Sequence, residues 1–189
     1  RHESSCGPLT AAYQTYVVRS IPAGGGLHAS AMEGGEAVIE EKYRDAALML
    51  EKAVPIIEKT GVKIIGLKDR YAKIVMPFET NINHIGIMYG GSLFILAEFS
   101  GGVIYYVSFD SSKFFPIVKE VSIRYRRPAT TDVTLEVALE EEEVQEIQEA
   151  ADREGKKDWV MDLELKDANG EVCSVVHGTW QLRKFPDKK

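Results

Sequence analysis

The sequence predicts an α+β fold in which one antiparallel sheet is wrapped around a long central helix. Residues 86–109 form an apolar run with a single charged side chain, Glu98. A helix that is apolar on every side is expected to lie buried in a core. The segments after this run alternate apolar and polar residues, which indicates a sheet with one buried face. Such a sheet and such a helix would cover each other's apolar surfaces.

Composition narrows the classes of function. The chain has 189 residues, 44% of them hydrophobic, which fits one domain or one domain with an appendage. Its net charge of -6 argues against a nucleic-acid partner, which would favour a basic surface. Cys6 and Cys173 form no paired motif, so we expect neither a disulfide framework nor a zinc site. A reducing, cytoplasmic location is therefore expected.

Residues 1–32 differ in character from the rest of the chain. They contain one acidic residue, two arginines and a run of three glycines, with no convincing periodicity. Two interpretations stay open. One is a leader, either expression-derived or upstream of a native start near Met32; the other is a targeting peptide, which would make the location organellar. We favour the first interpretation and expect a single domain over residues 33–189.

A helix is expected from Glu36 onward. Its apolar residues recur at spacings of three and four and form one stripe: Val38, Ile39, Tyr43, Ala46, Ala47, Leu50 and Val54. Pro55 should end or kink this helix and open a short second turn, which Thr60 and Gly61 close. Two short strands are expected next, over residues 62–67 and 71–78, around a turn at Lys68 and Asp69.

A loop over residues 79–89 should precede the apolar helix, and four strands should follow it. These strands are expected at residues 121–126, 133–139, 159–166 and 172–182, with a hairpin turn at 167–170. Residues 140–154 place Val144, Ile147 and Ala151 on one face of a short amphipathic helix. Its acidic face is best interpreted as the solvated side of a hairpin connection, in preference to an acidic binding surface.

The start of the apolar helix and Glu98 are the strongest candidates for chemistry. Gly90 and Gly91 allow close backbone approach at the helix start, where free N–H groups and the helix dipole stabilise negative charge. An oxyanion hole for a thioester carbonyl requires such donors. Glu98 lies two turns further on the same face, and desolvation would raise the pKa of this carboxyl and suit it to act as a base.

Other interpretations of these residues stay open. Glu98 could be a structural acid bonded to a Ser, Tyr or Arg side chain. Asn83 and His84, taken alone, fit ordinary loop and turn positions, and the glycines could serve helix–sheet packing. The apolar run is also long enough to span a membrane, but its glycines and its carboxylate favour a buried core helix, so no membrane span is expected.

Residues 83–98, read as Asn-His-Ile-Gly-Ile-Met-Tyr-Gly-Gly-Ser-Leu-Phe-Ile-Leu-Ala-Glu, resemble the signature of the PaaI-like hotdog-fold acyl-CoA thioesterases. Residues 117–129 resemble the strand of that family that follows the long helix and ends in an aromatic-x-x-Pro-Ala element, here within residues 123–129, and residues 167–172 resemble its final hairpin. The resemblance covers residues 62–183. The helical insertion at 140–156 is similar to that of an uncharacterised PaaI-related subfamily.

The resemblance implies a hotdog fold and a hydrolase that splits an acyl-CoA thioester into a free acid and coenzyme A. Glu98 would be the general base or the nucleophile, and the N–H groups of Gly91 and Gly90 would hold the thioester oxygen. Asn83 would orient the attacking water or the substrate. The further substrate-binding candidates are His84, Tyr89, Arg126 and Arg127, although the two arginines could equally be plain surface charge. No metal and no cofactor are implied beyond the coenzyme A of the substrate.

The resemblance also implies self-association as a homodimer or as a homotetramer of two dimers. The active site would lie between subunits, with Asn83 and Glu98 contributed by different chains. Tyr89 stands where the family usually has His, Glu98 where it often has Asp, and Val118 where a Ser or Thr sometimes assists. These departures leave open a non-catalytic acyl-CoA-binding module. A hotdog hydratase or dehydratase is a weaker alternative, because such enzymes use a His base.

Overall fold

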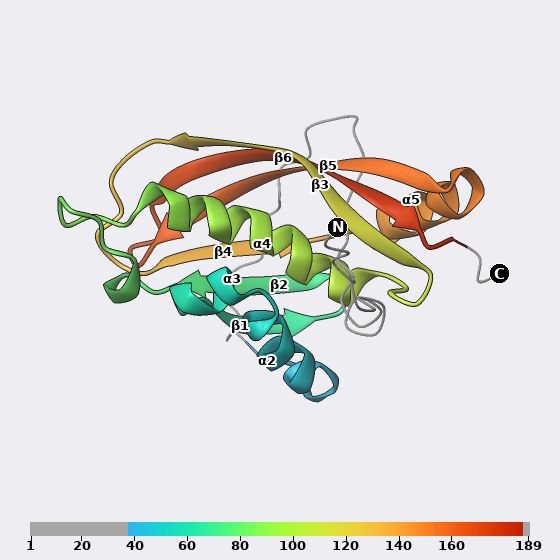
Figure 1. Cartoon of the computed structure of the whole chain (residues 1–189), viewed down its shortest axis with the longest axis horizontal. Helices are drawn as coiled ribbons and strands as arrows, with labels where there is room; N and C mark the ends of the chain where they lie inside the picture. The colour runs from blue at the N-terminus through green and yellow to red at the C-terminus, as the bar shows by residue number, and fades with distance from the viewer. Residues whose placement is uncertain (1–37, 187–189) are drawn as a thin grey trace, which may run out of the picture.

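The computed structural model describes residues 38–186, and it has the predicted α+β architecture (Figure 1). A six-stranded antiparallel sheet in the order β1-β2-β4-β5-β6-β3 curves around the long helix α4, which is the hotdog fold. The strands are β1 (Lys63–Lys68), β2 (Tyr71–Met76), β3 (Phe114–Tyr125), β4 (Val133–Ala138), β5 (Lys156–Asp167) and β6 (Val172–Lys184). The helices are η1 (Glu41–Tyr43), α2 (Arg44–Lys52), α3 (Pro55–Thr60), η2 (Glu79–Asn81), α4 (Gly90–Ser108) and α5 (Glu141–Glu154). The predicted leader at 1–32 lies outside the described residues.

Helix α4 forms the centre of the core. It begins after Tyr89, as predicted, and its buried residues lie on more than one side of the helix. Its length and apolar composition would suffice to cross a membrane, but 67% of its most apolar window is buried inside the fold. Gly101 allows α4 to approach β6 closely, because a methyl group at this position would overlap the indole ring of Trp180. Helix–sheet packing therefore accounts for this glycine.

The long strands β5 and β6 bury one apolar face each, whereas α4 packs mainly against β2, β3 and β4. Trp159 of β5 and Trp180 of β6 stack with their ring centroids 5.8 Å apart, and both side chains are buried. The hairpin turn between these strands is confirmed, with Gly170 at φ 80°. The predicted strand at 121–126 is too short, because β3 begins at Phe114 and pairs with β6 along nearly its whole length. Pro116 and the adjacent charged residues Lys119 and Glu120 interrupt the alternation of apolar and polar residues. The sequence pattern therefore did not indicate this extension.

The N-terminal helix begins later than predicted. Residues 38–40 do not continue a helix, because Ile39 forms a parallel bridge with Leu67 at the edge of β1. Glu40 donates its N–H to the carbonyl of Leu67 at 2.9 Å, and Leu67 donates to Val38 at 3.1 Å. These bonds satisfy backbone groups that a free strand edge would leave open. Positions 36 and 37, where the helix was expected to start, lie outside the described residues.

The remaining predicted helices are confirmed. Pro55 opens α3, and Gly61 ends it in the left-handed conformation with φ 74°. Helix α5 buries Val144, Ile147 and Ala151 against the sheet while its acidic side chains face outward. It lies at the opposite end of the molecule from the loop that precedes α4 (Figure 1). This distance supports the interpretation of α5 as a decorated connection with no part in the site.

Candidate active site

The first turn of α4 presents two backbone N–H donors that are free among the described residues, those of Gly90 and Gly91. Ser92 and Leu93 both donate their N–H groups to the carbonyl of Tyr89, at 2.9 and 3.3 Å. No acceptor within residues 38–186 takes the N–H groups of Gly90 and Gly91, and no side chain caps the helix. These donors and the positive end of the helix dipole can stabilise an oxyanion.

Two tyrosines pack against this helix start and explain why it contains glycine. A methyl group on Gly91 would overlap the ring of Tyr89, and one on Gly90 would lie 3.3 Å from the ring of Tyr125. The Tyr125 hydroxyl donates a hydrogen bond of 2.9 Å to the carbonyl of Gly90. Burial, and next the nearby Tyr89, raise the pKa of Tyr125, so this hydroxyl keeps its proton and remains a donor.

The loop before α4 is held by two asparagines with different roles. The side-chain oxygen of Asn83 accepts from the N–H groups of Ile85 at 3.0 Å and Ile87 at 3.3 Å, which shapes the loop locally. His84 is exposed at the tip of this loop. Sequence reasoning missed Asn81, which is buried and donates from its amide to the carbonyls of Thr60 and Pro77, each at 2.8 Å. An Asn in a loop gives no sequence signal that separates this anchoring role from that of Asn83.

Glu98 lies in an apolar cavity of about 280 Å³. Its other lining residues come from α2, α3, α4, β3, β6 and the α2–α3 junction: Leu50, Val54, Ile57, Phe99, Gly102, Pro116, Ile117, Val118 and Trp180. No hydrogen bond or ion pair within residues 38–186 reaches the Glu98 carboxylate, so the bonded structural acid considered above is not what the described chain contains. Burial raises the pKa of Glu98 above the ordinary value for a glutamate. A partly buried carboxylate with a raised pKa suits general-base chemistry.

Within one chain, the donors and the carboxylate form two separate halves of a site. Gly91 and Glu98 are seven residues apart, which is roughly 10 Å along a helix that rises about 1.5 Å per residue. The residues that line the Glu98 cavity do not include Gly90, Gly91 or Asn83. The described chain therefore does not bring the candidate oxyanion donors and the candidate base to the same cavity.

The two candidate arginines have different surroundings. Arg127 is tied to the β5–β6 hairpin, since its guanidinium pairs with Glu171 and with Asp167, and its Nε donates to the carbonyl of Val172 at 3.2 Å. Arg126 is exposed and makes no ion pair within the described part of the chain. Of the two, Arg126 is the one with a free guanidinium for a phosphate.

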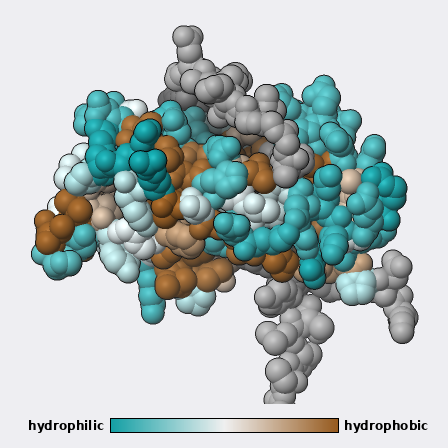
Figure 2. Space-filling model, turned by 90° about the horizontal axis from the view of Figure 1, so that it is seen from above, coloured by the Kyte–Doolittle hydropathy of each residue, from teal (hydrophilic) through white to brown (hydrophobic). Residues whose placement is uncertain are grey.

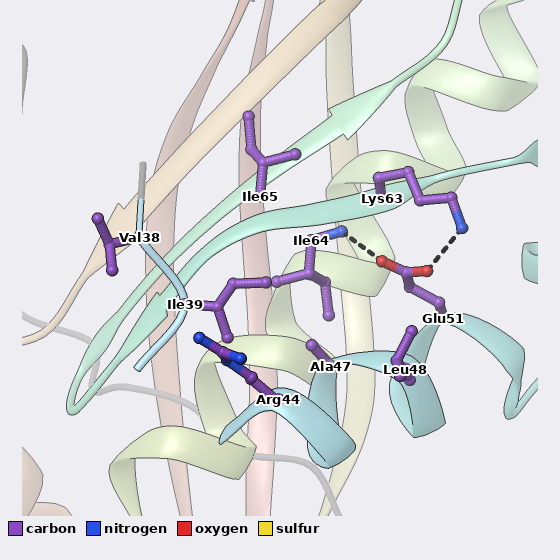
Figure 3. Close-up of a pocket in the computed structure, with 9 residues that line it drawn as sticks. All are labelled: Val38, Ile39, Arg44, Ala47, Leu48, Glu51, Lys63, Ile64 and Ile65. Atoms are coloured by element: carbon purple, nitrogen blue, oxygen red, sulfur yellow. Dashed lines mark hydrogen bonds and ion pairs between the residues drawn. The ribbon is translucent and has the colours of Figure 1, made fainter. Parts of the chain in front are cut away.

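A larger hollow of about 600 Å³ lies on the other side of α2, against the edge of β1 (Figure 3). Its one buried acid is Glu51, whose carboxylate accepts from the Ile64 N–H at 2.9 Å and pairs with Lys63 at 2.7 Å. Both oxygens of Glu51 are therefore engaged. We place the candidate active site at the smaller cavity, because only that one contains a carboxylate without a partner among the described residues.

Strand β3 is an edge of the sheet and carries exposed apolar side chains. Ile117 and Val118 are each 42% exposed and Tyr125 is 51% exposed. From above, brown hydrophobic surface is concentrated in the left and middle parts of the view, and the right end is largely hydrophilic (Figure 2). No group of three or more His, Cys, Asp or Glu side chains within residues 38–186 could hold a metal ion.

Comparison with solved structures supports the fold and the family. A Pseudomonas aeruginosa protein of unknown function, called a probable thioesterase, is 36% identical with a TM-score of 0.73, and the match covers 80% of this chain and 100% of that one. A Chlorobaculum tepidum protein of unknown function matches with a TM-score of 0.66 at 18% identity, over 76% of this chain and 95% of that one.

A Haemophilus influenzae thioesterase matches with a TM-score of 0.58 at 13% identity, over 79% of this chain and 94% of that one. No curated protein matches the sequence. The family model described as a domain of unknown function, DUF4442, matches residues 45–182. The chain therefore belongs to the DUF4442 family and has the hotdog fold.

Proposed function

We propose that this protein hydrolyses an acyl-CoA thioester to a free acid and coenzyme A, with Glu98 as the catalytic carboxylate. The observation that carries the proposal is an unpartnered glutamate in an otherwise apolar cavity. The similar Pseudomonas aeruginosa protein is called a probable thioesterase, and the more distant Haemophilus influenzae protein is called a thioesterase, which supports the same reaction.

In the proposed reaction, the thioester oxygen accepts hydrogen bonds from the N–H groups of Gly91 and Gly90 at the start of α4. Glu98 takes a proton from water as the water oxygen attacks the carbonyl carbon. The developing oxyanion is stabilised by the amides, and the carbon–sulfur bond then breaks to release the coenzyme A thiolate. Direct attack by the Glu98 carboxylate is the alternative first step, and it would form an anhydride that water then hydrolyses.

We propose further that the active protein is a dimer in which the site forms between two copies. Strand β3 presents a long edge with exposed apolar residues, and such an edge favours pairing with another strand. Pairing of β3 with its copy would bring a second α4 to the open side of the Glu98 cavity. Gly91 and Asn83 of one subunit would then face Glu98 of the other, and a tetramer would be two such dimers.

Arg126 is our candidate for the phosphates of coenzyme A, because its guanidinium is exposed and free of ion pairs among the described residues. Arg127 would act indirectly, by holding the hairpin beside it. Tyr89 and His84 would contact the substrate at the mouth of the site.

Two measurements test these proposals. Incubation with acyl-CoAs should release free thiol, and Glu98→Gln should abolish the release while the far-UV circular dichroism stays unchanged. Tight binding without thiol release by the unaltered protein would instead indicate an acyl-CoA-binding module. Thiol release that survives in a folded Glu98→Gln variant would disprove the assigned role.

The arrangement across two chains is tested by subunit mixing. Glu98→Gln and Gly91→Ala chains should each be inactive alone, because Gly91→Ala displaces Tyr89 from the helix start. Refolding them together should restore activity, since each mixed dimer would contain one site with an intact Glu98 and an intact Gly91. If both groups act within one chain, mixing restores nothing.

A further inference from the structure

We infer that the corner between α2 and α3 forms a fixed wall of the acyl-binding cavity and restricts the protein to short and medium hydrocarbon acyl groups. This inference rests on the proposed function, because it takes the Glu98 cavity as the place where the acyl group lies. It adds the substrate class and the residues that set it.

The cavity has the chemistry of a hydrocarbon site. Apart from the carboxylate of Glu98, its lining consists of aliphatic and aromatic side chains, Pro116 and Gly102. Glu98 and Phe99 both lie beside Gly102 on the surface of α4, because positions three and four residues apart are neighbours on a helix. An acyl group with a carboxylate of its own would meet a second anion in Glu98, and among the other lining side chains only Trp180 carries a polar group, its indole N–H. The lining therefore favours unsubstituted acyl chains.

The wall is contributed by three residues on a bend of the chain. Leu50 is the last buried apolar residue of α2, Val54 lies at the junction, and Ile57 is in the first turn of α3. Leu50 and Ile57 are 2% and 6% exposed, so they are closely packed, while Val54 is 38% exposed at the rim. Pro55 fixes the bend, because proline opens a new helix and cannot continue the previous one.

Hydrogen bonds hold this wall in place. The Thr60 hydroxyl donates to the carbonyl of Ile57 at 2.6 Å, and the side chain of Asn81 donates to the carbonyl of Thr60 at 2.8 Å. The carbonyl of Asn81 in turn accepts from the N–H of Tyr89 at 2.7 Å. The wall is thus connected to the start of α4 through one residue, and it is built as a rigid boundary.

The part of the cavity that one chain forms is small, and the α2–α3 corner closes it on one side. Its volume of about 280 Å³ within one chain lies just below the ~300–1,000 Å³ typical of small-molecule sites. Coenzyme A itself cannot fit in this space and would remain outside, so the cavity is left to the acyl group. Gly102 contributes to the space, since any larger residue on this face of α4 would project into it.

The test compares kcat/KM for acetyl-, butyryl-, octanoyl- and palmitoyl-CoA in the unaltered protein and in variants of two adjacent isoleucines. Ile57→Ala should raise the preference for palmitoyl- over butyryl-CoA by about tenfold or more, as expected when methylenes are accommodated in an apolar pocket. Ile56→Ala is the matched control, because Ile56 is 61% exposed and does not line the cavity. Val54→Ala, at the partly exposed rim, gives the same test if Ile57→Ala does not fold.

Gly102→Ala provides the opposite change. Alanine favours the helix more than glycine does, so loss of activity cannot be assigned to a weaker α4. It should reduce hydrolysis of octanoyl-CoA while acetyl-CoA is still hydrolysed. Profiles that do not differ between Ile57→Ala, Val54→Ala and Ile56→Ala would overturn the inference, as would efficient hydrolysis of palmitoyl-CoA by the unaltered protein.

A failure of the proposed function would look different, since none of these thioesters would then release thiol from any variant. In that case the wall is tested by equilibrium binding of the same four acyl-CoAs. The same shift toward longer chains is expected for Ile57→Ala and not for Ile56→Ala. Equal binding profiles would overturn the inference.

Discussion

Glu51 is buried and Glu98 is partly buried, and both line hollows beside α2, but their surroundings differ. Glu51 is 6% exposed, and its two oxygens are bonded to the Ile64 N–H and to the Lys63 ammonium. Glu98 has no such partner among residues 38–186, and burial raises the pKa of its carboxyl. Glu51 joins α2 to the edge strand β1, whereas Glu98 retains two oxygens that can take a proton. The partners of a buried acid therefore separate an architectural role from a chemical one.

The largest contrast is expected in catalysis. Glu98→Gln should lower kcat by roughly 10²–10⁴-fold, the usual contribution of a general base. Glu51→Gln should leave kcat within a few-fold of the unaltered value, because the hollow that it lines lies apart from the reacting groups. Steady-state thiol release measures both. A comparable loss in the two variants would show that the comparison does not separate structure from chemistry.

Stability should show the reverse contrast. Glu51→Ala should reduce the free energy of unfolding by about 1–3 kcal/mol, because it leaves the buried Ile64 N–H without an acceptor. Glu51→Gln keeps an oxygen for that N–H and should lose less. Urea unfolding followed by circular dichroism gives both values. The expectation fails if alanine and glutamine are equally destabilising.

The pH dependence of stability sharpens the role of Glu98. Because burial raises its pKa in the folded state, the folded protein holds this proton more tightly than the unfolded chain does. Its contribution to stability is therefore present at acid pH and is lost as the pH rises through the folded pKa. Glu98→Gln should be more stable than the unaltered protein at neutral pH. Thermal unfolding across pH should show this difference shrinking toward about pH 4, and a difference that grows on acidification would contradict it.

The smallest effect should come from the exposed half of the Glu51 interaction. Lys63→Met removes the ion pair but keeps the bond from the Ile64 N–H, and the Lys63 side chain is 58% exposed. The Glu51 end of this pair is buried but solvent screens the Lys63 end, so the loss in unfolding free energy should be about 1 kcal/mol, the upper end for surface pairs. It should also disappear at high salt, which screens the pair. A loss as large as that of Glu51→Ala would mean that the ion pair, and not the backbone bond, holds β1 to α2.

Local sequence patterns were sufficient to predict where α4 begins, the order of the strands along the chain and the position of Glu98 on α4. The glycine pair, the absence of other charges and period-two alternation are all properties of neighbouring residues. The N-terminal helix was predicted too early because Val38 and Ile39 fit a helical stripe and an edge strand equally well. Which one forms depends on the open edge of β1, more than twenty residues away along the chain.

The rest of the site depends on contacts between distant segments. Nothing in residues 50–57 indicates that they border the same cavity as Glu98, since the sheet must first curve around α4 to bring them together. Arg126 and Arg127 are neighbours with identical side chains, and only the hairpin at 167–171 distinguishes them. Asn81 and Asn83 differ in the same way, because the anchor of Asn81 is the end of α3.

Asn81 has a consequence for how such a pocket can change over time. Through its amide and its carbonyl, this residue connects the ends of α3 and β2 with the first residue before α4. A backbone shift that enlarged the pocket would also move the N–H donors of Gly90 and Gly91. A wider range of substrates would therefore come with slower hydrolysis. New substrate preferences are therefore more accessible by exchanging the side chains at positions 54 and 57 than by remodelling the loop that carries Asn81.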